Sequence, residues 1–240
     1  VLYTHGIFEA QVKIFEDIFG IQAGEVELSA FPLFSLFSAA LGVTVIVPDM
    51  DATKPAEVSP FNITEAIDDH GITYAFGSPA FWRVLVPAWE EANYVPQSML
   101  RVLMAGAPAP PELLEGLIRV LPETADVYTP FGATEWLPIS LPSAREILSA
   151  RHHEDTKKGK GTCVGRPMPG TQVRIIPITD EPMTELPEAL PPGEIGEITV
   201  TSPVTTQGYF RRPNDDAKSK IDHDGRRWHR DRHGDGGEHY

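Results

Sequence analysis

The sequence is poor in cysteine and in positive charge, and each shortage argues against a class of protein. A single cysteine, Cys163, cannot form an intramolecular disulfide, so nothing indicates an oxidising compartment and a cytoplasmic location is expected. Lys and Arg number 20 against 34 Asp and Glu, a net charge of −14. This balance argues against a general binder of nucleic acid or anionic membranes, because both need a basic patch. The start at Val1 carries no basic segment followed by an apolar run, so no signal peptide is expected and the sequence reads as a fragment.

Long uncharged segments are also scarce, and the one exception does not favour a membrane span. Residues 28–48 carry no charge over 21 positions, which is long enough to cross a bilayer. Pro32, Gly42 and the β-branched run at 43–47 interrupt the segment, however. They favour a short helix followed by a buried strand. No transmembrane segment is therefore expected.

Apolar periodicity and turn residues predict alternating helices and strands in the first part of the chain. Helices are predicted at residues 4–19, 34–41, 62–70, 81–92 and 111–121, and strands at 43–47, 72–76, 100–104 and 125–129. This alternation is typical of βαβ units, so we expect an α/β fold with a mostly parallel sheet and flanking helices. Two later β-rich runs, 172–178 and 194–201, have no helix between them and predict a smaller, antiparallel part. The expected domains are an α/β subdomain at 1–155, with nucleotide and acyl sites, and a truncated β-rich subdomain at 156–240.

The last 18 residues contain four of the eight histidines. His229 and His233 have the spacing of metal ligands on a helix, and Asp231 and Asp235 lie close to them in the sequence. Glycines at positions 234, 236 and 237 oppose a helix. The segment is therefore interpreted as a polar chain end in preference to a structural metal site.

The segment Tyr128–Glu135 follows a predicted strand, at the sheet edge where ligands bind in open α/β folds. Gly132 allows close approach of a ligand to the backbone. Thr134 offers a hydroxyl to a phosphate oxygen, Glu135 offers a carboxylate to Mg²⁺, and Phe131 offers a flat face to a base. Taken alone, the segment favours an aromatic turn before a helix that begins with a Thr-Glu pair over a ligand site.

A second loop, Met104–Pro110, also follows a predicted strand, and its small residues and prolines suit a planar ligand. Several glycine motifs come later in the chain. They are Gly165-Arg166-Pro167-x-Pro169-Gly170, Gly193-Glu194-Ile195-Gly196-Glu197-Ile198, Gly208-Tyr209-Phe210 and Gly234-Asp235. Each alone indicates only a turn.

In this order and spacing, these motifs resemble the large domain of the adenylate-forming superfamily: acyl-CoA synthetases, peptide-synthetase adenylation domains and luciferases. The resemblance runs from Phe31-Pro32-Leu33-Phe34 to Gly208-Tyr209. It implies that the superfamily's phosphate loop lies upstream of Val1 and that its small C-terminal domain follows Tyr240, so the fragment alone is expected to be inactive.

The resemblance also implies roles for individual residues. Thr134 and Glu135 are the catalytic pair, with Thr134 on the α-phosphate and Glu135 holding Mg²⁺. The nucleotide-binding set implied is Gly106, Ala107, Pro108, Phe131, Gly132, Thr134 and Asp235. Asp235 would accept hydrogen bonds from the ribose hydroxyls. Three residues separate the pair Gly234-Asp235 from Trp228-His229-Arg230, however, where the family has a shorter spacing; the cause is either an insertion or a frame slip. The acyl-pocket set implied is Phe34, Ser35, Phe37, Phe81 and Trp82, and ordinary core packing is the alternative for these aromatic residues.

Three segments are similar to the β-lactone synthetases of long-chain olefin biosynthesis: residues 2–12, Phe31–Phe37 and Pro48–Asp51. This similarity implies that ATP activates a 3-hydroxy carboxylic acid as an acyl-adenylate, which then closes to a β-lactone. The cofactors implied are ATP and Mg²⁺, and the partner is a small carboxylic acid. Two alternatives remain open: a fatty acyl-CoA or acyl-AMP ligase, for which CoA would be needed, and a non-catalytic nucleotide-binding fragment.

Overall fold

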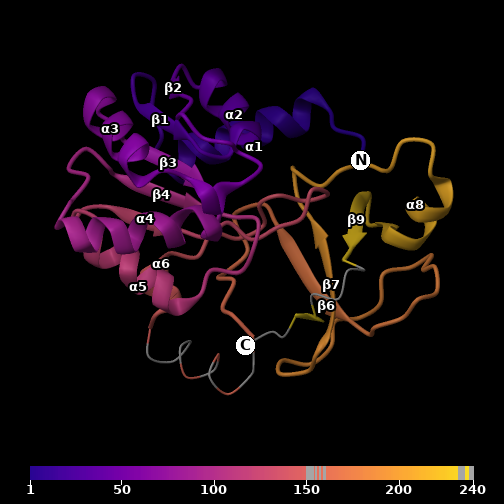
Figure 1. Ribbon diagram of the computed structural model, residues 1–240. Helices are drawn as coiled ribbons and strands as arrows, with labels where there is room; N and C mark the ends of the chain where they lie inside the picture. The colour runs from indigo at the N-terminus through magenta and orange to yellow at the C-terminus, as the bar shows by residue number, and fades with distance from the viewer. Residues whose placement is uncertain (150–153, 155, 157, 159–160, 232–235, 238–240) are drawn as a thin grey trace. The chain divides into compact units, whose positions relative to one another are not determined.

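The computed structural model describes residues 1–149, 154, 156, 158, 161–231 and 236–237. Contacts divide the chain into two compact units (Figure 1). Unit 1 consists of Val1–Gln11, Gly132–Ser140 and Pro167–Tyr240, and unit 2 of Val12–Phe131 and Leu141–Arg166. Each unit joins separate stretches of the chain. The division into domains at residues 155 and 156 therefore stays a prediction.

Unit 2 is built on a five-stranded sheet in which every pairing is parallel, with the order β2-β1-β3-β4-β5. The strands are β1 (Val26–Ser29), β2 (Thr44–Ile46), β3 (Tyr74–Gly77), β4 (Arg101–Met104) and β5 (Asp126–Tyr128). The helices described up to residue 149 are α1 (His5–Asp17), which begins in unit 1, η1 (Pro32–Phe34), α2 (Ser35–Ala40), η2 (Pro55–Glu57), α3 (Pro60–His70), α4 (Pro79–Ala92), α5 (Pro111–Val120) and α6 (Ala144–Ile147). The α/β class with a mostly parallel sheet is confirmed.

Local sequence accounts for the helix boundaries. The side chains of Ser59 and Ser78 accept hydrogen bonds from backbone N–H groups in the first turns of α3 and α4, and a proline opens each helix. Such capping satisfies N–H groups that have no partner within the helix. Gly71 ends α3 with a φ of 59°, a left-handed conformation that glycine adopts without strain.

The first strand, β1, was not among the predicted strands. Glu27 and Ser29 interrupt its apolar residues, so the segment lacks the continuous hydrophobic run of a strand buried on both faces. In the structure β1 nevertheless pairs with β2 and β3, and Glu27 and Ser29 are 1% and 2% exposed. The strand is therefore buried in spite of its polar residues.

The two faces of this sheet differ in character. Leu28, Ala75 and Val102 belong to the main hydrophobic core together with residues of α3, α4 and α5. Because successive strand residues point to opposite faces, Glu27 and Ser29 lie on the other face. Tyr74 and Phe76 are their register partners on β3. The sheet therefore has one apolar face and one face with a polar stripe.

Unit 1 contains the antiparallel sheet predicted for the later part of the chain. Its order is β10-β7-β9-β8, and β6 also pairs with β7. The elements are β6 (Gln172–Ile176), β7 (Gly196–Thr201), α8 (Pro213–Ser219), β8 (Lys220–His223), β9 (Arg226–Arg230) and β10 (Gly236–Gly237).

The interpretation of the last residues as a polar chain end is wrong for the stretch 223–231. Strands β8 and β9 form a hairpin there, and Trp228, His229 and Arg230 are buried. Hydrophobic packing of Trp228 with Leu186 and Ile221 contributes to holding the hairpin. His233, Gly234 and Asp235 lie outside the described residues.

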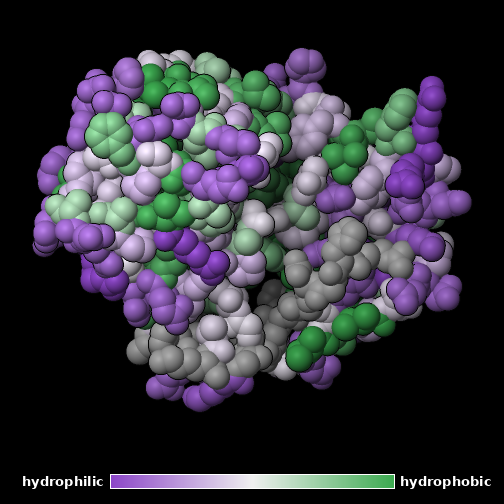
Figure 2. All heavy atoms as spheres, in the orientation of Figure 1, coloured by the Kyte–Doolittle hydropathy of each residue, from purple (hydrophilic) through white to green (hydrophobic). Residues whose placement is uncertain are grey.

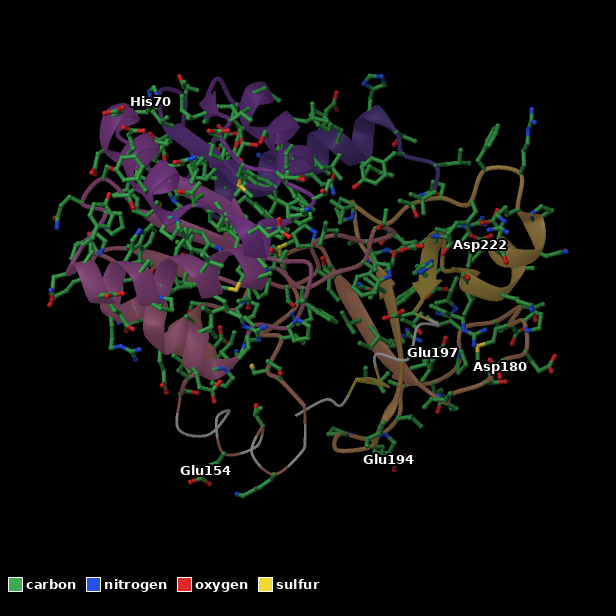
Figure 3. The ribbon with its side chains drawn as sticks, viewed as in Figure 1. His70, Glu154, Asp180, Glu194, Glu197 and Asp222 are labelled. Carbon is green, nitrogen blue, oxygen red and sulfur yellow. The ribbon has the colours of Figure 1, made fainter. Side chains whose placement is uncertain are left out.

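An ion pair between Arg230 and Glu197 lies inside unit 1. Arg230 is fully buried, and its Nη2 lies 2.8 Å from Oε2 of Glu197. Glu197 lies on β7 and is labelled in Figure 3. The same guanidinium donates to the carbonyl oxygens of Thr179, Glu181 and Lys218. These bonds offset the cost of burying the charges. They also attach the proline- and glutamate-rich stretch around residue 181 to the sheet.

Hydrophilic side chains cover much of the face shown in Figure 2, with hydrophobic ones between them. Large exposed apolar side chains include Leu33, Leu36, Val47 and Phe61. Among the described residues, no helix is both long and apolar enough to cross a membrane.

Candidate active site

The residues of the Tyr128–Glu135 motif fall in both units: Phe131 belongs to unit 2, and Gly132, Thr134 and Glu135 to unit 1. Each group is therefore described within its own unit.

Close packing fixes the backbone around Glu135. A Cβ at Gly132 would lie 2.9 Å from Leu137 Cα, so only glycine fits without a shift of the chain. Trp136 is 1% exposed, and its backbone N–H donates a hydrogen bond to the carbonyl oxygen of Ala133. The carbonyl oxygen of Glu135 accepts a hydrogen bond of 2.8 Å from the N–H of Thr206. Glu135 is thus held on a rigid turn.

Tyr209 orients the carboxylate of Glu135. The Tyr209 hydroxyl donates to Glu135 Oε1 at 2.7 Å. Burial, and then the hydrogen bond and negative charge of Glu135, raise the pKa of Tyr209 above its ordinary value, so the phenol stays protonated as a donor. The Tyr209 N–H donates to Asp216 Oδ1 at 2.7 Å, and a Cβ at Gly208 would lie 2.9 Å from Asp216 Oδ2. Close packing against Asp216 therefore explains the glycine at position 208, and Tyr209 lies beside Glu135.

Lys220 is a buried cation beside this carboxylate. Its Nζ donates to the carbonyl oxygen and the hydroxyl of Thr206, at 2.7 and 3.1 Å, and lies 5.7 Å from the centre of the Tyr209 ring. Lys220 is only 5% exposed. Burial lowers its pKa to about 8, although the charge of Glu135 opposes the shift. Thr206 thus connects Lys220 to Glu135, since it bonds to both.

A magnesium ion fits the donor set at Glu135. The carboxylate is half-buried, and Tyr209 donates to one of its oxygens. Within the described residues there is no cluster of three or more His, Cys, Asp or Glu side chains that would hold a metal alone. Magnesium commonly takes one or two protein carboxylates and completes its shell with phosphate oxygens and water. A single, oriented carboxylate is consistent with that chemistry. The neighbouring Thr134 side chain is exposed.

In unit 2, several candidate residues lie at the carboxyl edge of the parallel sheet. Gly106, Ala107 and Pro108 follow the end of β4 and are exposed, and Phe131 follows β5 and is half-buried. The carboxyl ends of parallel strands meet at one edge, where ligands of open α/β sheets bind. Gly106 has a φ of 94°, which favours glycine, and a Cβ there would lie 3.5 Å from the Phe31 ring.

The candidate acyl residues separate onto the two faces of the sheet. Phe34 stacks on Phe76 with ring centres 4.2 Å apart, and Phe37 stacks on Phe15 at 5.2 Å. Phe81 and Trp82 are fully buried in the main core of the opposite face. This placement favours packing as the role of Phe81 and Trp82. Ser35 lies with the first group, and its hydroxyl donates to Glu27 Oε1 at 3.2 Å.

Sequence reasoning missed three residues of this description. Tyr209 belongs to a Gly-Tyr motif of the family resemblance but received no role there, while Lys220 and Glu27 had no signal at all. Asp235, the candidate for the ribose, lies outside the described residues.

Comparison with known proteins places this geometry in a family. The family model described as "AMP-binding enzyme" matches residues 1–210. The chain belongs to this family. An olefin β-lactone synthetase of Stenotrophomonas maltophilia is 43% identical over 223 residues, covering 92% of this chain and 39% of the relative. The corresponding protein of Xanthomonas campestris is 40% identical, with the same coverage.

Among solved structures, the o-succinylbenzoate CoA synthetase of Bacillus subtilis in complex with AMP has a TM-score of 0.72 and 25% identity; the match covers 99% of this chain and 44% of that one. The shared fold is that of the large domain of adenylate-forming enzymes, and the resemblance inferred from the sequence motifs is confirmed. The chain spans about two-fifths of the length of the curated relatives it matches.

Proposed function

We propose that the protein to which this chain belongs activates a long-chain 3-hydroxy carboxylic acid with ATP and closes it to a β-lactone. The observation that carries the proposal is the 43% identity to an olefin β-lactone synthetase over 92% of the chain. The oriented carboxylate of Glu135 supports it, because activation of an acid by ATP requires control of phosphate charge.

In the first step, the substrate carboxylate attacks the α-phosphorus of ATP, and pyrophosphate leaves with the electrons of the broken P–O bond. Positioning and charge stabilisation supply most of the catalysis in such a reaction. Glu135 holds Mg²⁺, which supplies neutralisation of phosphate charge when bound. Thr134, with its exposed side chain, offers its hydroxyl to the α-phosphate. Tyr209 keeps the Glu135 carboxylate in one orientation.

The proposed adenine contacts in unit 2 follow the carboxyl edge of its sheet, and unit 1 supplies Gly132 and Asp235. Phe131 stacks on the adenine, and the exposed Gly106–Pro108 loop lies along it. Gly132 gives the backbone close access to the ligand. Asp235 accepts from the ribose hydroxyls. A cytoplasmic location, where ATP and Mg²⁺ are supplied, is part of the same proposal.

In the second step, the 3-hydroxyl oxygen attacks the activated carbonyl carbon, AMP leaves with the electrons of the acyl–phosphate bond, and the hydroxyl proton is released. The attack is intramolecular and needs no second substrate. An apolar environment would protect the adenylate from hydrolysis. The aromatic rings of Phe34 and Phe37, on the face that carries Ser35, are the proposed wall of that environment.

A fatty acyl-CoA ligase is the second candidate. A feruloyl-CoA synthase of Amycolatopsis is 30% identical over 85% of this chain, which favours it. In such an enzyme a thiol of CoA, and not the substrate's own hydroxyl, would displace AMP.

The product mass distinguishes the two candidates. The complete gene product, including any residues encoded on either side of this chain, is incubated with Mg·ATP and a long-chain 3-hydroxy acid, with and without CoA. A product lighter than the acid by one water, formed equally well without CoA, is expected. A CoA adduct would identify a ligase, and the absence of pyrophosphate release with every acid would contradict both.

A further inference from the structure

A buried polar network lies under α2 in unit 2, on the face of the sheet opposite the main core. Its members are Glu27 and Ser29 on β1, Ser35 and Ser38 on α2, and Tyr74 on β3. Four of them are at most 2% exposed; Ser35 is half-buried and is the member nearest the surface. Carboxyl groups rarely lie in the interior of a parallel sheet, because burial removes their hydration.

Two sets of hydrogen bonds hold the network, one around Ser35 and one around Ser38. The Ser29 and Ser35 hydroxyl oxygens are 2.5 Å apart, and Ser35 Oγ donates to Glu27 Oε1. On the other side the Tyr74 hydroxyl donates to Ser38 Oγ at 2.7 Å. Burial raises the pKa of Glu27, and the nearby Ser38 and Ser35 hydroxyls oppose the shift. Glu27 Oε2 is buried and accepts no hydrogen bond from the described residues.

These bonds determine what Ser35 can offer to a ligand. A serine hydroxyl has one proton to donate and two lone pairs to accept with. Since the Ser35 proton points to Glu27, the short contact with Ser29 uses the Ser29 proton and one Ser35 lone pair. One lone pair remains. Ser35 therefore presents a hydrogen-bond acceptor and has no proton left to donate.

The surroundings of Ser35 are apolar and lie at the carboxyl edge of the sheet. Phe34 and Phe37 flank it in sequence, and their ring centres are 6.1 Å apart. Phe31 packs against Phe34 at 5.2 Å and approaches the position of a Cβ on Gly106. Gly106 begins the loop proposed to lie along the adenine. The Ser35 hydroxyl is thus a polar point in an aromatic wall next to that loop.

We propose that Ser35, oriented by Glu27 and Ser29, accepts a hydrogen bond from the 3-hydroxyl group of the acid substrate. This inference rests on the proposed function and adds the group that selects a 3-hydroxy acid from an unsubstituted one. The aromatic rings contact the alkyl chain, and the acceptor at Ser35 distinguishes a hydroxyl from groups of similar size that carry no proton. Ser35 touches the substrate, whereas Glu27 is a positioning residue.

Three acids of the same chain length test the proposal with the complete gene product: the 3-hydroxy acid, the 3-fluoro acid and the unsubstituted acid. The measurement is kcat/KM for pyrophosphate release. Fluorine approaches a hydroxyl in size but has no proton to donate. We expect the unmodified protein to prefer the 3-hydroxy acid to both others by about tenfold, the effect of one hydrogen bond. Equal kcat/KM for the 3-hydroxy and 3-fluoro acids would overturn the inference without any mutation.

Variants test whether Ser35 and Glu27 produce the preference for the 3-hydroxy acid. Ser35→Ala is expected to lower kcat/KM about tenfold for the 3-hydroxy acid and less than twofold for the other two. Ser35→Thr restores a hydroxyl and is expected to restore the preference. Glu27→Gln replaces one acceptor oxygen with an N–H donor, which competes for the Ser35 oxygen, and the preference is expected to fall as in Ser35→Ala.

Glu25→Gln is the matched control. Glu25 immediately precedes β1, at the amino end of the strand that carries Glu27, and is paired with Arg101, so Glu25→Gln removes a neighbouring carboxylate without touching Ser35. It is expected to leave the ratio between the three acids unchanged. If Ser35→Ala changes kcat/KM for all three acids equally, the inference is wrong while the proposed function stands. If the unmodified protein releases no pyrophosphate with any acid, the proposed function fails and the inference fails with it.

Discussion

The hydroxyl of Tyr209 donates a 2.7 Å hydrogen bond to Glu135 Oε1, across 74 residues of sequence. The two side chains come from different turns of unit 1, one after Gly132 and one after Gly208. The Thr206 N–H donates a hydrogen bond of 2.8 Å to the backbone carbonyl oxygen of Glu135. The carboxylate therefore cannot rotate freely, and its orientation depends on a residue far away in the chain.

Replacing Tyr209 by phenylalanine removes this hydrogen bond and keeps the ring. We expect Tyr209→Phe to lower kcat/KM for pyrophosphate release about five- to tenfold in the complete gene product, and to raise the Mg²⁺ concentration needed for half-maximal rate. The rate is measured over a Mg²⁺ titration. Tyr94→Phe removes a similar tyrosine–carboxylate bond, to Asp68 in unit 2, and is expected to leave the Mg²⁺ dependence unchanged. Identical titrations for both variants would contradict a role of Tyr209 in orienting Glu135.

Loss of the charge on Glu135 should cost more than loss of its orientation. Glu135→Gln keeps an oxygen that can accept from Tyr209 but removes the negative charge that holds Mg²⁺. We expect pyrophosphate release to fall about 10²-fold or more, as is typical when an electrostatic stabiliser is removed. Glu194→Gln, at an exposed position of unit 1, is the control (Figure 3). Full activity of Glu135→Gln at every Mg²⁺ concentration would remove the assignment.

The sequence predicted the elements of both sheets well where the apolar pattern was simple. Strand β4 and helix α5 follow such patterns, and capping serines and prolines mark the starts of α3 and α4. Strand β1 was missed because Glu27 and Ser29 alternate with its apolar residues, as in a strand with one solvated face. Only the structure shows that α2 covers that face through Ser35 and Ser38.

Some residues of the candidate site could also be predicted from the sequence, and others could not. Glu135 belongs to a compact motif and could be named from its chemistry and its place after a strand. Lys220 could not, because nothing in the segment around it differs from an ordinary solvated lysine. Its partner Thr206 is 14 residues away, and the ring of Tyr209 is brought to it by α8 and its flanking turns. Contacts of this kind arise from tertiary packing and leave no local pattern.

The buried pair of Arg230 and Glu197 should be important for stability. Arg230→Ala leaves the Glu197 carboxylate buried without its cation, and the carbonyl oxygens of Thr179 and Glu181 without their donor. We expect the free energy of unfolding to fall by about 3–5 kcal/mol, measured by urea denaturation. Arg227→Ala, at a partly exposed side chain whose partner Asp222 is largely exposed, should cost less than about 1 kcal/mol. Similar losses for the two variants would show that burial does not govern the contribution of Arg230.

Lys220 gives the protein a stability that depends on pH. Below pH 8 the lysine is charged in both the folded and the unfolded state, and the folded state carries the cost of burying the charge. Between about pH 8, its pKa when folded, and pH 10.5, its ordinary value, the folded state has released the proton and the unfolded state still binds it. The unfolded state then binds more protons, so the free energy of unfolding rises with pH through this window.

The methionine variant isolates this contribution. In Lys220→Met no proton is bound at this position in either state, so its stability should lack the rise that the lysine gives to the unmodified chain between pH 8 and 10.5. Relative to Lys220→Met, the free energy of unfolding of the unmodified chain is expected to rise by about 3 kcal/mol at most, which corresponds to the whole shift of the Lys220 pKa. Unfolding free energies measured in urea at pH 7, 8, 9 and 10 give both curves. Parallel curves would mean that Lys220 has the same pKa in both states, and that its bonds to Thr206 offset the whole cost of burial.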